Sequence, residues 1–204
     1  MPRTIDLRRL KATTVAGIDK SKKRIDDATQ AKLHYFLLRW MCQMTAVEVH
    51  QAWERYVEMR LIAALNHDPR HFLAAQNIKG VSRVSYGLAT YIIRGGNRYF
   101  DFRSMGELID KAETWVAVNM FRALPASDRN YIDALAAIRN CVVHRSDAAM
   151  RAYRRSLGQV YGIKSAPEPA EFLYAKDTRN TSPARYQIRL YGLMTVVRRS
   201  VLST

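Results

Sequence analysis

Cysteine is scarce in this sequence, and long apolar runs are absent from it. Only two cysteines, Cys42 and Cys141, occur among the 204 residues, far apart and in no metal-binding or redox spacing. A disulfide framework is therefore excluded, and we expect neither a metal nor another cofactor. No run of about 18 apolar residues occurs, so we predict that no segment spans a membrane.

Acidic residues are few in comparison with basic ones. Eighteen Asp and Glu stand against 33 Lys and Arg, which gives a formal net charge of +15 at pH 7. A surface this basic attracts polyanions, so RNA or another nucleic acid is the expected partner. An acidic protein and an anionic membrane surface are the alternatives. The first residues include basic side chains but no apolar segment after them, which predicts a cytoplasmic protein without a secretory signal.

Glycine and proline are also sparse, and the apolar residues recur at intervals of three and four, which is typical of helices. We therefore predict an all-α fold. Residues 19–44 are expected to form one continuous helix. A second helix is expected over about 46–65, ended by residues 66–69. Residues 90–102 (TYIIRGGNRYFDF) are compatible with a short hairpin or an irregular loop.

Helix start signals mark the second half of the chain. Ser and Glu three apart form a capping box, and Ser followed by Pro is an N-cap with a first-turn residue. The expected helices run from Met105 to about Leu124 after Ser104, from Ser127 through His144, over 146–157, and from Ser182–Pro183 to the C-terminus, with 162–172 as a loop. We expect a single helical bundle with an irregular middle, a core at about 30–160, and a basic C-terminal extension at about 165–204.

The segment IRNCVVHR, residues 138–145, carries the most informative group of side chains. Arg139 has a permanent charge and a planar fork that suits phosphate. His144 can take or give a proton near neutral pH, and Asn140 can hold a phosphate oxygen or a neighbouring group. Together they provide a base and a cation for attack of a ribose 2′-OH on a phosphate, a reaction that needs no metal.

The spacing within this segment raises a geometric difficulty. Five residues correspond to about 500° of helical rotation, so Arg139 and His144 lie roughly 140° apart on an ideal helix. Fraying of the helix near His144 would narrow the gap. Alternatively, a second copy of the chain would contribute the missing group across a two-fold interface that includes residues 127–145.

RNCVVH resembles the R-N-x-x-x-H form of the motif that marks the HEPN superfamily. The segment HQAWERYVEMRL, residues 50–61, is similar to the aromatic and acidic first core helix of such domains. The resemblance covers about residues 30–160, and the separation of the two helices is similar to the RiboL-PSP-HEPN type.

The resemblance implies a helical domain that dimerises with both motifs facing one cleft. It further implies a metal-independent endoribonuclease that leaves a 2′,3′-cyclic phosphate, in a toxin–antitoxin or phage-defence role. Arg139 and His144 would be catalytic, and Asn140 would orient the site or pack at the dimer interface. One subclass has a tyrosine two residues after the motif histidine as a target of nucleotidylation; Ser146 occupies that position here, so that form of regulation is not expected.

Each of these residues also has a structural interpretation. His144 would suit the C-terminus of a helix as a cation. Arg139 would pair with a carboxylate such as Glu54, which makes Glu54 a supporting candidate for the site. A non-catalytic HEPN module that binds nucleic acid, or a helical protein that docks an acidic antitoxin or complex subunit, is the alternative function.

Overall fold

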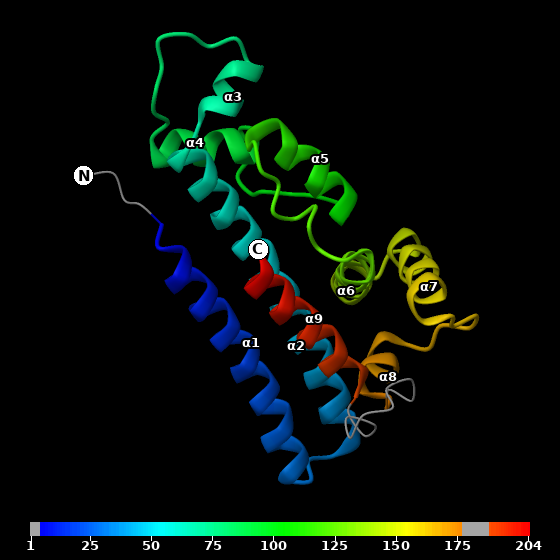
Figure 1. Cartoon of the computed structure of the whole chain (residues 1–204). Helices are drawn as coiled ribbons and strands as arrows, with labels where there is room; N and C mark the ends of the chain where they lie inside the picture. Colours follow the sequence, from blue (N-terminus) through cyan, green and yellow to red (C-terminus); the bar gives the residue numbers. More distant parts are fainter. Residues whose placement is uncertain (1–4, 177–187) are drawn as a thin grey trace.

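The structure, a computed structural model, describes residues 5–176 and 188–204. Within these residues the chain forms nine helices and no strand, which confirms the all-α prediction. The helices, drawn in Figure 1, are α1 (Leu7–Gln30), α2 (Tyr35–His67), α3 (Arg70–Ala75), α4 (Tyr86–Arg94), α5 (Met105–Trp115), α6 (Ala126–His144), α7 (Asp147–Tyr161), α8 (Pro169–Tyr174) and α9 (Arg189–Ser203).

The first two helices are an antiparallel pair, and the prediction of one helix over 19–44 is wrong. α1 ends at Gln30, and the chain reverses through Lys32, whose φ of 53° is left-handed. Leu33 donates its backbone N–H to the Ala28 carbonyl and closes the turn. The reversal lets the apolar face of α1 pack along α2, where Ile25 is buried. Tertiary packing therefore outweighs the local helix preference of this charged stretch.

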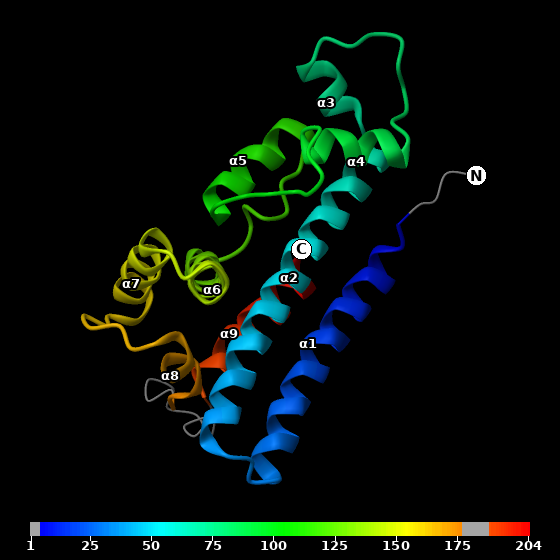
Figure 2. The ribbon, with the colours of Figure 1, turned by 180° about the vertical axis from the view of Figure 1, so that it is seen from behind.

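α2 is the central helix of the molecule. In Figures 1 and 2 it lies between α1 on one side and α6 and α7 on the other. Trp53 and Tyr56 are fully buried on it, and the Trp53 ring packs edge-on against Phe121. α9 packs against α1, α2 and α6, and Tyr56 donates its hydroxyl hydrogen to the Val201 carbonyl. The predicted end of this helix at residues 66–69 is confirmed, since α2 stops at His67.

The segment between α5 and α6 departs from the prediction of a helix reaching Leu124. α5 ends at Trp115 because the next residue is extended and Asn119 donates its side-chain amide to the Ile109 carbonyl. This path places Phe121 in the core beside Trp53, where it is fully buried. α6 then begins at Ala126, one residue before the predicted start at Ser127, and Pro125 occupies the cap position.

Other boundaries agree with the sequence in part. Ser104 accepts a hydrogen bond from the Glu107 N–H as predicted, while the Glu107 carboxylate accepts from the Arg103 N–H. The helix predicted over 146–157 is confirmed as α7. Ser146 caps its start, and it continues beyond the predicted end to Tyr161. The hairpin alternative at 90–102 is wrong, because this range contains the end of α4. The predicted loop over 162–172 is wrong in its last part, because α8 begins at Pro169. The predicted start at Ser182–Pro183 lies outside the described residues.

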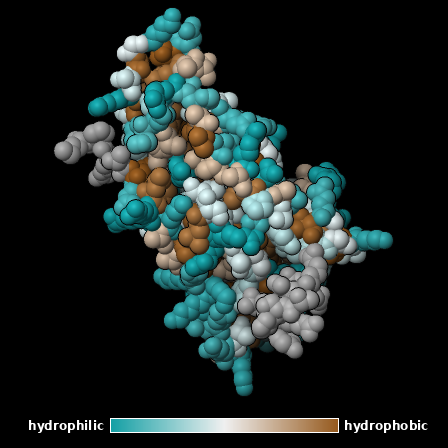
Figure 3. Space-filling view, viewed as in Figure 1, coloured by the Kyte–Doolittle hydropathy of each residue, from teal (hydrophilic) through white to brown (hydrophobic). Residues whose placement is uncertain are grey.

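The surface in the view of Figure 3 is mainly hydrophilic, with apolar side chains in separate patches. Among the described helices, none combines the length and the apolar character that crossing a bilayer requires.

Candidate functional site

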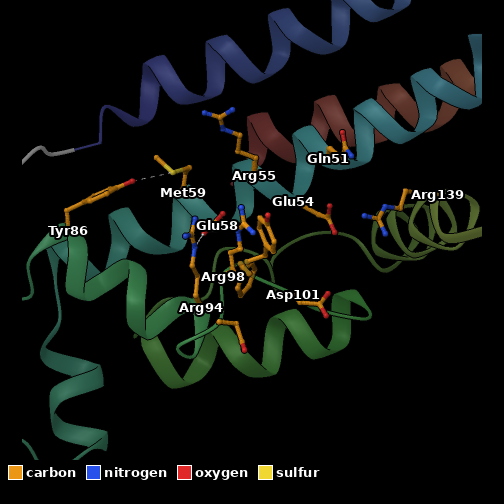
Figure 4. A pocket seen from close by; sticks show the side chains of 13 residues that line it. Gln51, Glu54, Arg55, Glu58, Met59, Tyr86, Arg94, Arg98, Asp101 and Arg139 are labelled. Atoms are coloured by element: carbon orange, nitrogen blue, oxygen red, sulfur yellow. Dashed lines mark hydrogen bonds and ion pairs between the residues drawn. The ribbon is translucent and has the colours of Figure 1, made fainter. Parts of the chain in front are cut away.

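The helix that carries the motif is held firmly by its apolar side. Ile132, Leu135 and Ile138 are buried, and α6 packs against α2, α7 and α9. Asp128 in the first turn is also buried and accepts two hydrogen bonds from Arg199 of α9. With its buried side fixed in this way, α6 presents Arg139 toward α2, as Figure 4 shows.

Arg139 is oriented by the residue that follows it. Its Nη1 donates a hydrogen bond of 2.7 Å to the side-chain oxygen of Asn140. The Arg139 Nε is buried and has no hydrogen-bond partner among the described residues. A buried donor without a partner is rare and unfavourable. Because this Nε is closed to solvent, a ligand in the cleft lined by Arg139 would contact the terminal nitrogens of the guanidinium.

Glu54 of α2 faces Arg139 across a cleft (Figure 4). Burial by itself would raise the pKa of Glu54, but His50 and the charge of Arg139 outweigh it and hold that pKa below its ordinary value. The His50 Nδ1 lies 3.4 Å from the Glu54 Oε2. Among the described ion pairs none joins Glu54 to Arg139 directly. The predicted Arg139–Glu54 contact is therefore absent from the described ion pairs, and the two side chains interact only through the longer-range attraction of their charges.

His144 lies apart from this cleft. It is the last residue of α6 and is exposed, and its side chain forms no hydrogen bond or ion pair with the residues that the structure describes. Arg145, with a φ of 49°, ends the helix directly after it. Because α6 stays helical through His144, fraying does not bring the imidazole toward Arg139. Within one chain the two predicted catalytic groups therefore do not converge.

The cleft itself has a volume of about 1060 Å³ and lies between α2, α4, the loop that follows α4, and α6. We call it the arginine cleft because four arginines line it. These are Arg55, Arg94, Arg98 and Arg139, accompanied by three carboxylates, Glu54, Glu58 and Asp101. The Arg94 Nε lies 2.5 Å from the Glu58 Oε1, which ties α4 to α2 and neutralises both charges.

Several residues of this site have no clear signal in the sequence. Arg55, Arg94 and Arg98 are scattered over two helices and a loop, and only folding brings them beside Arg139. His50, buried four residues before Glu54, shows a weak signal in its i,i+4 spacing. The loop of Arg98 has a compositional signal, since GGNRYF combines glycines with a basic and two aromatic residues.

Comparisons of the whole chain with protein-family models, with curated proteins and with solved structures find no match.

Proposed function

We propose that this protein is a metal-independent endoribonuclease of the HEPN type. The observation that carries the proposal is the state of the two motif residues on α6. Arg139 is oriented by Asn140 into a cleft with three further arginines, and His144 is exposed and unpaired among the described residues. A phosphate-binding cation and an available proton acceptor are the two groups that RNA transesterification requires.

In the proposed reaction, His144 removes the proton of a ribose 2′-OH. The 2′-oxygen then forms a bond to phosphorus while the bond from phosphorus to the 5′-oxygen breaks. Arg139 stabilises the negative charge on the phosphate oxygens, and the departing 5′-oxygen takes up a proton. The products are a 2′,3′-cyclic phosphate and a 5′-hydroxyl.

The separation of His144 from the arginine cleft supports a dimeric site. A second copy placed around a two-fold axis through α6 would bring its His144 to the Arg139 of the first chain. We therefore propose a homodimer with two composite sites. A toxin–antitoxin or phage-defence role, with an acidic antitoxin countering the +15 charge, is the biological setting that we propose for this activity.

The first experiment is digestion of mixed cellular RNA in EDTA by wild type and the His144→Ala variant. We expect cleavage by wild type only, with cyclic phosphate ends. The His67→Ala variant is the matched control, because His67 is also an exposed histidine at the end of a helix. Cleavage that persists in His144→Ala, or products with a 5′-phosphate, would refute the mechanism.

A mixing experiment tests the composite site. Arg139→Ala and His144→Ala are each expected to be inactive alone. If each site combines residues of two chains, random mixing makes half of the dimers heterodimers, each with one intact site of two, and restores roughly one quarter of wild-type activity. A site built within one chain predicts no recovery.

The alternative is a module that binds RNA without cutting it, and the distance of His144 from the cleft favours it. Salt-sensitive RNA binding by wild type, with no cleavage product at any enzyme concentration, would select this alternative.

A further inference from the structure

The arginine cleft extends well beyond Arg139, and most of it has no part in the reaction proposed above. Arg55 and Arg98 are exposed and form no ion pair with any residue that the structure describes. In contrast, Arg94 is neutralised by Glu58, and Glu54 faces His50 and Arg139. Two arginines of the cleft are therefore free to bind an anion.

An aromatic side chain accompanies these cations. Tyr99 is 66 % exposed although its neighbours anchor the loop, since the Phe100 ring packs against Phe102 and Trp115. The Arg98 guanidinium lies over the Tyr99 ring, 5.2 Å from its centroid. An exposed ring on an anchored loop provides a flat apolar surface on which a nucleobase can stack. The cation beside the ring can bind the phosphate attached to that base.

Arg55 lies at the border between this cleft and a second hollow. The second hollow, about 760 Å³ in volume, lies between α1 and α2, and Arg9 lines it. Figure 4 shows Arg55 on the side of α2 that faces α1, whereas Arg94 and Arg98 extend from α4 and its loop. The two hollows share Arg55 in their linings, whereas Arg98 and Arg139 line the arginine cleft alone, so Arg55 lies where the cleft meets the second hollow.

We propose that the arginine cleft is a binding site for single-stranded RNA, in which Arg98 and Arg55 contact backbone phosphates and Tyr99 stacks on a base. RNA is chosen as the ligand because this proposal rests on the proposed function. The bound strand would lie beside the phosphate that Arg139 stabilises in the cleavage reaction. Single-stranded RNA fits better than a duplex, because an unpaired base is free to stack on a side chain.

The test measures binding of a fluorescent 2′-O-methyl oligoribonucleotide by anisotropy. This probe lacks the 2′-OH that the cleavage chemistry needs, so binding is measured whether or not the protein is a nuclease. We expect Arg55→Gln/Arg98→Gln to bind at least tenfold more weakly than wild type. The slope of log affinity against log salt should fall by roughly 1.4 for two lost phosphate contacts.

The matched control is Arg151→Gln/Arg155→Gln, which removes the same charge from exposed positions of α7. We expect this variant to keep the wild-type salt slope. For the stacking contact, Tyr99→Leu should weaken binding about tenfold, and Tyr99→Phe should retain it. Equal losses in both double variants, or wild-type binding by Tyr99→Leu, would overturn the proposal.

The outcomes separate this proposal from the proposed function. If wild type binds RNA through the cleft but does not cleave it, the proposed nuclease activity is refuted and the proposed RNA site is supported. Cleavage that depends on His144, with unchanged binding by Arg55→Gln/Arg98→Gln, would retain the nuclease and refute this RNA site.

Discussion

Asn140 accepts a 2.7 Å hydrogen bond from the Nη1 of Arg139, its neighbour in sequence. Adjacent residues on a helix diverge by about 100°, so the contact requires both side chains to bend toward each other. It restricts the motion of the guanidinium at the edge of the arginine cleft. This contact is the structural basis for the positioning role that we propose for Asn140.

We expect Asn140→Ala to lower the single-turnover rate of RNA cleavage about tenfold, because a hydrogen bond to a charged group is worth about 1.5–3 kcal/mol. Asn140→Asp keeps an acceptor for Arg139 but adds a negative charge, so it should mainly weaken RNA binding at low salt. The measurement is the rate at saturating enzyme together with affinity for an uncleavable RNA. Equal rates in wild type and Asn140→Ala would remove the positioning role.

The low pKa of Glu54 has a consequence for stability. A carboxyl group whose pKa is depressed in the folded state contributes stability above its unfolded pKa and loses it as the pH falls through the folded value. We expect wild type to melt at a higher temperature than Glu54→Gln at pH 7. The difference should shrink below about pH 4.3, the ordinary glutamate pKa.

Thermal melts of both proteins from pH 7 to pH 3 test this expectation. Asp110→Asn is a suitable control, since Asp110 is exposed on α5 and forms no ion pair with any residue that the structure describes. A wild-type advantage that persists unchanged at pH 3 would show that the Glu54 charge is not responsible.

Two adjacent arginines of α9 should differ in their effect on stability. Arg199 is the partner of the buried carboxylate of Asp128, whereas Arg198 pairs with Asp19 and both of those side chains are about half exposed. Removing the partner of a buried charge leaves it uncompensated, while an exposed pair contributes little. We expect Arg199→Met to destabilise by about 1–3 kcal/mol, since Arg199 itself is partly solvated, and Arg198→Met by less than about 1 kcal/mol.

Chemical denaturation of the two variants measures the difference, and each is the other's control for the lost charge. Equal free energies of unfolding would show that the Asp128–Arg199 pair does not link α6 to α9 energetically.

Local signals in the sequence predict some of the helices, whereas α3, α4 and α8 have no predicted counterpart. The spacing of apolar residues predicts the second half of α2, and Ser104 marks the start of α5. The turn between α1 and α2 and the end of α5 were missed. Both depend on distant contacts, such as the burial of Phe121 beside Trp53, which no local pattern records.

The sequence by itself determined the helical class, the excess of positive charge, and the placement of Arg139, Asn140 and His144 on one helix, because these follow from composition and helical periodicity. Tertiary structure decided which side chains meet. The packing of α2, α4 and α6 brings Arg55 and Arg98 into one cleft with Arg139 and leaves His144 outside it. Residue spacing sets the direction in which a side chain leaves its own helix. Only the packing of the helices against one another determines which residues of other helices that side chain faces.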